Sequence, residues 1–102
     1  MFKNFTPHDI VLNNGQVFAS EGLARVSVSF SVFNTDNMCQ QQFGDVIGLP
    51  EPTNNVKYIV SALVLAAAKA SGRIDCVAPA TGHPNCVRND KGFIVSVPGF
   101  VE

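Results

Sequence analysis

The residue near the N-terminus best suited to chemistry is His8, which follows Thr6-Pro7 and precedes Asp9. An imidazole titrates near neutral pH, so it can act as a general acid or base or donate a hydrogen bond to a phosphate. One histidine without a visible partner does not define catalysis, and a turn histidine that packs locally is the alternative. We take His8 as the candidate catalytic residue, and Thr6 and His8 as candidate ligand-binding residues.

Arginines and a loop carboxylate are further candidates. Arg25 interrupts an apolar run and Arg88 adjoins a turn, and a planar guanidinium suits recognition of phosphate or carboxylate. Pairing with acids such as Glu51, Asp75 or Asp90 is the alternative, because arginine also forms structural ion pairs. Glu51 lies between two prolines and could act as a base or simply be exposed on its loop. The complete candidate ligand-binding set is Thr6, His8, Arg25, Glu51 and Arg88.

Cys76, His83 and Cys86 raise the question of a zinc site. His83 and Cys86 have the spacing of a ligand pair, but Cys76 lies further away and a fourth ligand would have to come from Cys39 or His8. Two half-buried thiols that flank a loop are the simpler interpretation, so we expect no metal site. Glycine-rich phosphate-binding loops are absent, and we expect no cofactor.

The composition favours one folded domain over residues 1–102. Charged residues make up 15% of the chain, against about 25% in soluble domains, which argues against disorder. A net charge of −1 without a basic run argues against binding to long nucleic acids. No apolar stretch approaches the length of a membrane span and no signal core begins the chain. With three cysteines, an odd number, we expect a cytoplasmic protein that does not bind membranes.

The element expected to organise the fold is a helix over residues 61–70. Alanines fill its second half, Ser61 can cap its start and Gly72 can end it in a left-handed conformation. Apart from Ser61 and Lys69 the segment is apolar all round, which predicts a fully buried helix. A helix this short needs tertiary support, and we expect strands to wrap it.

The rest of the chain is typical of strands. Asn13-Asn14-Gly15 predicts a hairpin, and residues 23–33 and 38–47 predict a second strand pair with a bulge at Gly44. Over residues 26–32 apolar residues alternate with serines, which predicts one face against the helix and a polar face rather than a serine nucleophile. Further short strands are expected over 56–60, 73–78, 86–88 and 93–97. The predicted fold class is α+β: a small single domain with a mostly antiparallel sheet of about six strands packed on one buried helix.

Five segments, in order along the chain, carry a family resemblance: residues 4–8, 44–52, 58–61, 73–75 and 87–94. The first, Asn-Phe-Thr-Pro-His, is similar to the Asn-Leu-Thr-Pro-His opening of a family of small uncharacterised phage and bacterial proteins. The second contains Gly-Leu-Pro-Glu-Pro and the third is Tyr-Ile-Val-Ser. Residues 79–86 are longer than the Pro-Gly connection of that family, which argues against a role for His83. The resemblance implies a phage-type accessory protein that redirects or disarms the host from within its cytoplasm.

Two functions of different classes remain open. The first is binding of a small nucleotide-like ligand such as an immune signal, which His8 could also hydrolyse as an acid or base. A homo-oligomer would fit this function, because small domains often build a ligand pocket between subunits. The alternative is a protein–protein inhibitor of a host enzyme without a small-molecule site, acting through edge strands and the loop over residues 50–55.

Overall fold

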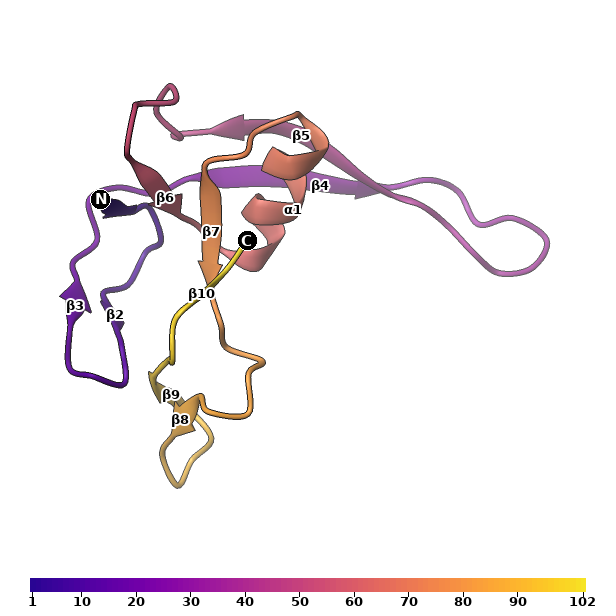
Figure 1. Cartoon of the computed structure of the whole chain (residues 1–102). Helices are drawn as coiled ribbons and strands as arrows, with labels where there is room; N and C mark the ends of the chain where they lie inside the picture. Colours follow the sequence, from indigo (N-terminus) through magenta and orange to yellow (C-terminus); the bar gives the residue numbers. More distant parts are fainter.

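The computed structural model describes all 102 residues and has the α+β class, with one helix among ten short strands (Figure 1). The helix α1 spans Ala62–Ala70. The strands are β1 (Phe2–Asn4), β2 (Ile10–Val11), β3 (Val17–Phe18), β4 (Arg25–Phe30), β5 (Gln41–Ile47), β6 (Lys57–Ile59), β7 (Cys76–Pro79), β8 (Val87–Arg88), β9 (Ile94–Ser96) and β10 (Phe100–Val101).

The expectation of one mostly antiparallel sheet of about six strands is wrong. The largest sheet has four strands in the order β1-β6-β7-β10, and β6 pairs in parallel with both β1 and β7. Only β10 is antiparallel to its neighbour. The segment β6–α1–β7 is a parallel crossover, in which a helix returns the chain to the start of the next strand. The remaining strands form three separate hairpins: β2–β3, β4–β5 and β8–β9.

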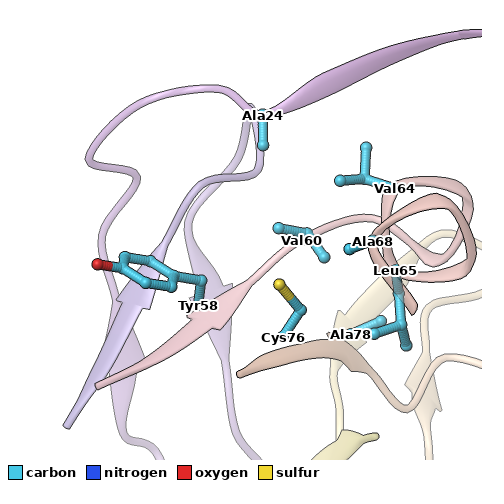
Figure 2. Close-up of a cluster of buried hydrophobic side chains, with 8 residues drawn as sticks. All are labelled: Ala24, Tyr58, Val60, Val64, Leu65, Ala68, Cys76 and Ala78. Atoms are coloured by element: carbon cyan, nitrogen blue, oxygen red, sulfur yellow. The ribbon is translucent and has the colours of Figure 1, made fainter. Parts of the chain in front are cut away.

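The two central strands are buried on both faces, which explains their continuous apolar sequences. Tyr58 and Val60 of the β6 segment belong to a cluster of eight buried residues that also contains Cys76 and Ala78, with Val60 near α1 and the Tyr58 ring at the far end (Figure 2). Ile59, between them, faces the other way and packs with Ile10, Val77 and Val97. The alternation of side chains along a strand thus divides one short strand between two small cores.

The helix begins and ends as predicted, but it is not buried all round. Ser61 caps it, with the Val64 N–H donating to the Ser61 hydroxyl at 3.2 Å. Gly72 follows with a φ of +94°, the left-handed conformation that a C-terminal glycine supplies. Val64 is buried whereas Leu63 is 42% exposed. The four-stranded sheet and the β4–β5 hairpin both contact α1, and the remaining side of the helix, which includes Leu63, faces solvent.

The hairpins predicted from turn signals are confirmed. Gly15 has a φ of +91° in the β2–β3 turn. The β4–β5 ladder has an irregularity opposite Gly44, where Val26 pairs with Val46 but Val28 pairs with Phe43. A Cβ at Gly44 would collide with the Ser27 hydroxyl, which would have to rotate away to make room.

The β4–β5 hairpin extends well beyond the rest of the molecule. Figure 1 shows its closing loop projecting past α1, away from every other element. The molecule measures 49 × 38 × 18 Å, with a radius of gyration of 15.3 Å, whereas a compact domain of this length has about 13 Å. The expectation that the whole apolar face of residues 26–32 packs on the helix is therefore wrong for its distal half, because α1 has only nine residues.

Candidate functional site

A partly enclosed cavity of about 410 Å³ lies between the first turn of α1, the loop before β2, and β9. Its lining comes from residues 6, 8–11, 61–62, 79, 81 and 94–97. Its size is within the range of small-molecule sites in proteins, which is about 300–1,000 Å³. Two of the predicted site residues, Thr6 and His8, contribute to it.

A buried asparagine positions the loop that carries His8. The Asn4 side chain is only 1% exposed, and its amide nitrogen donates to the backbone carbonyls of His8 at 2.8 Å and Phe18 at 2.9 Å. Its amide oxygen accepts from the Thr6 N–H at 2.9 Å. The Thr6 hydroxyl lies 2.6 Å from this same oxygen and 2.9 Å from the His8 carbonyl. Thr6, which we expected to bind ligand, therefore uses its hydroxyl mainly to hold the loop.

A second set of contacts attaches this loop to Ser20, in the segment that follows β3. Ser20 donates its hydroxyl to the Thr6 carbonyl at 2.6 Å, and its N–H donates to an Asp9 carboxylate oxygen at 2.9 Å. The backbone on both sides of His8 is thus fixed. The His8 side chain itself is exposed at the cavity, where it is free to meet a ligand.

The first turn of α1 adds backbone donors to the cavity wall. Ser61 and Ala62 line the cavity, and the first N–H groups of a helix have no partner within the helix. The Ser61 hydroxyl satisfies the N–H of Val64, so that of Ala62, which lines the cavity, remains for a ligand or water. A helix start of this kind favours anions, because the helix dipole adds partial positive charge.

The cavity wall also has polar and apolar parts that restrict what fits. Asp9 also lines the cavity, and its carboxylate, one oxygen of which accepts from the Ser20 N–H, disfavours anions nearby but can accept further hydrogen bonds from hydroxyl or amino groups. Ile94 and Val95, which are 45% and 52% exposed, present apolar surface. The cavity therefore combines an anion-favouring end with a wall suited to a flat, partly apolar group.

The other three predicted site residues do not line this cavity. Arg25 is exposed at the start of β4, opposite Ile47. Glu51 is exposed, and its carbonyl accepts from the Tyr58 hydroxyl at 3.2 Å. Arg88 donates to the Gly92 carbonyl at 2.9 Å and to the Thr81 carbonyl at 3.2 Å. The structure therefore does not gather His8, Arg25 and Arg88 at one site, although Arg88 holds the backbone of Thr81, which does line the cavity.

Arg73, the third arginine, forms a structural ion pair with Asp75. Such pairing was the alternative to ligand binding that we considered for the arginines. Its Nε and Nη2 atoms donate to the two carboxylate oxygens of Asp75, each at 2.8 Å. Nη2 also donates to the Pro50 carbonyl at 3.0 Å, and the guanidinium lies 6.0 Å from the centre of the Tyr58 ring. The hydrogen bonds between these two side chains lower the pKa of Asp75 and raise the pKa of Arg73. This arginine stabilises the fold beneath the 50–55 loop.

The cysteine and histidine residues considered for zinc have other partners. Cys76 is buried among apolar side chains, with its sulfur pointing toward Val60 (Figure 2). Burial, aided by the Asp75 carboxylate, raises the pKa of the Cys76 thiol to about 11. His83 accepts a hydrogen bond on Nδ1 from the Asn85 N–H at 3.0 Å, and no group of three or more potential metal-binding side chains lies together.

Sequence reasoning missed several residues of the cavity. Ser61 was identified as a helix cap, but nothing in the sequence placed His8 beside it, because the two are brought together by the parallel pairing of β1 with β6. Asn4 was part of the resembling segment without a role of its own. Thr81 and Ser96 carry no motif; the loop and hairpin that present them approach the cavity only through tertiary packing.

The sequence matches no protein-family model, and neither a curated protein nor a solved structure matches it. The single helix is too short to cross a membrane.

Proposed function

We propose that this protein binds a small nucleotide-like ligand in the cavity beside α1, as a phage-type accessory protein acting on a host signal. The observation that supports the proposal most directly is the position of His8 on the wall of a 410 Å³ cavity that also contains the start of α1. Together they offer donors for a phosphate group.

The rest of the cavity fits the other parts of such a ligand. The exposed Ile94 and Val95 provide apolar contact for a base, and the Asp9 carboxylate can accept from a ribose hydroxyl or an exocyclic amine. A ligand with several phosphates would be disfavoured, because Asp9 repels the second and third charges and no lysine or arginine lines the cavity. We therefore expect monophosphate or cyclic nucleotides to bind more tightly than triphosphates.

Calorimetric titration of the full chain against inorganic phosphate, nucleoside monophosphates, triphosphates, cyclic nucleotides and ADP-ribose tests the proposal. His8→Ala should weaken binding about tenfold, the usual effect of losing a hydrogen bond to a charged group. Arg25→Ala is the matched control, because Arg25 is exposed and lies outside the cavity. Absence of heat with every compound, or equal loss in both variants, would overturn the proposal.

Hydrolysis of the ligand by His8 is an additional question for the same compounds. His8 could act as an acid or base on a water or a leaving group. Chromatography of each nucleotide after incubation, with wild type and His8→Ala in parallel, distinguishes a binding protein from an enzyme. A binding protein returns every ligand intact.

Inhibition of a host enzyme through a protein surface is the second candidate. The observation that favours it is the amount of exposed apolar surface, including Phe30, Val32 and Phe33 on the β4–β5 hairpin. Under this function His8→Ala has no effect, and pull-down from host lysate recovers a stoichiometric protein. A protein that only binds a nucleotide recovers none.

A further inference from the structure

We infer that the β4–β5 hairpin is a dimerisation arm, which packs against the same arm of a second copy of this chain. The inference does not depend on the proposed ligand. It starts from the apolar side chains on one face of β4 and its continuation, whose exposure rises with distance from α1.

The exposure of this face follows the length of the helix. Val26 and Val28 are half-buried, and Val26 packs against the core cluster beneath α1. Two and four residues further on, Phe30 is 65% exposed and Val32 is 90% exposed. Alternation along the strand keeps these residues on one face, so the same apolar stripe runs from the core into solvent. The helix covers its first half and no part of the chain covers the second.

The backbone of the arm is equally uncovered. β4 and β5 pair only with each other, so the outer edge of each strand has no strand partner. Edge strands that must stay unpaired usually carry lysine, proline or other charges. Between residues 27 and 44 the only charged side chain is Asp36, in the closing turn. A two-stranded hairpin without further cover is marginally stable in water, so the arm needs a partner.

The surface area of the chain agrees with a dimer in which each copy covers the other. A compact monomer of 10.9 kDa exposes about 5,600 Å², whereas this chain exposes 6886 Å². The difference, about 1,300 Å² per chain, exceeds the roughly 800 Å² that each partner contributes to a standard interface. The excess belongs to the whole chain, whose β2–β3 and β8–β9 hairpins also project (Figure 1), and it is large enough to include one half of a standard homodimer interface.

The chemistry of the arm favours a second copy over another protein. A two-fold interface brings the same patch of both copies together, so a patch with many like charges would repel itself. Serine, glutamine, phenylalanine and valine dominate the arm and carry no charge. An uncharged apolar stripe with free strand edges is self-complementary, because each edge supplies both donors and acceptors to the other.

Light scattering and sedimentation velocity over a range of protein concentrations test the inference. Wild type should have twice the mass of one 10.9 kDa chain, and the double variant Phe30→Ser, Val32→Ser should raise the dimer dissociation constant at least about tenfold. Because both side chains are exposed in the single chain, the variant should remain folded, which circular dichroism checks.

Phe93→Ser is the matched control. Phe93 is 67% exposed, nearly the same as Phe30, but lies on the β8–β9 hairpin. The inference predicts that it leaves the mass unchanged. Hydrogen exchange supplies a second measurement: amides between residues 28 and 43 should exchange more slowly as concentration rises, while those of β8 and β9 should not change. A monomer at every concentration, or a dimer lost in Phe93→Ser and kept in the arm variant, would overturn the inference.

Discussion

Arg73 and Asp75 meet through two parallel hydrogen bonds of 2.8 Å, and the same guanidinium holds the Pro50 carbonyl at 3.0 Å. Both side chains are largely shielded, at 22% and 14% exposed. One arginine therefore connects the chain after α1 to the loop before β6. Several properties of the fold depend on this pair.

Replacing Arg73 by lysine should reduce stability by about 2 kcal/mol, because an ammonium cannot reproduce the two-point contact and leaves the Pro50 carbonyl without its donor. Urea denaturation measures the change. The control is Lys57→Ala, which removes a 3.8 Å ion pair to the 80% exposed Glu102 and should cost less than about 1 kcal/mol. Equal effects of the two variants would contradict a special role for Arg73.

The Arg73–Asp75 pair should make the free energy of unfolding depend on pH under acidic conditions. The hydrogen bonds from Arg73, with its charge, lower the pKa of Asp75 below the ordinary value of 3.8. A carboxyl with a lowered pKa contributes stability that is present above the unfolded pKa and is lost as pH falls through the folded value. Below about pH 4, wild type should therefore lose more stability than Asp75→Asn, which has no carboxyl to protonate. Parallel acid profiles of the two proteins in urea titrations would refute this assignment.

Cys76 should be chemically inert in the folded protein. Burial raises the pKa of its thiol to about 11, and the thiolate is the reactive form. Iodoacetamide at pH 8 should modify the half-buried Cys86 of the native protein at least about tenfold faster than Cys76. Mass spectrometry of the peptides measures both rates, and in denaturant the two should converge. Rapid native modification of Cys76 would show that the helix-side core opens easily.

Asn4 should be the most sensitive polar position of the chain. Asn4→Ala removes the side-chain donor to the His8 and Phe18 carbonyls and the side-chain acceptor of the Thr6 N–H, at an expected cost of about 3 kcal/mol. Because the network positions the loop of His8, ligand binding should weaken as well. Asn54→Ala, at an exposed loop position, is the control and should change neither property. A stable Asn4→Ala protein would mean that water replaces the side chain.

Gly48 should tolerate no side chain. Its φ is +87°, and an added Cβ would collide with the Leu23 carbonyl oxygen. Gly48→Ala should therefore lower the free energy of unfolding by about 2 kcal/mol, whereas Gly82→Ala, at a site with open space and no positive φ, should change it little. Thermal melts of both variants check the difference.

Local sequence was sufficient for the elements whose signals are local. The cap at Ser61, the left-handed Gly72, the Asn14-Gly15 turn and the bulge at Gly44 are all present. Each depends on the conformational preference of one or two residues, and such preferences act within a few residues along the chain.

Tertiary pairing decided the rest. Whether β6 and β7 lie parallel, and whether α1 covers the whole β4–β5 hairpin, depend on contacts between segments far apart in sequence, which periodicity does not encode. His8 was chosen for its chemistry, and it lies at a cavity. Arg25 and Glu51 were chosen on the same chemical grounds and lie elsewhere. The sequence alone determines which side chains are chemically suited to a site. Bringing such side chains together requires the chain to close long loops, and only the tertiary structure specifies which loops close together.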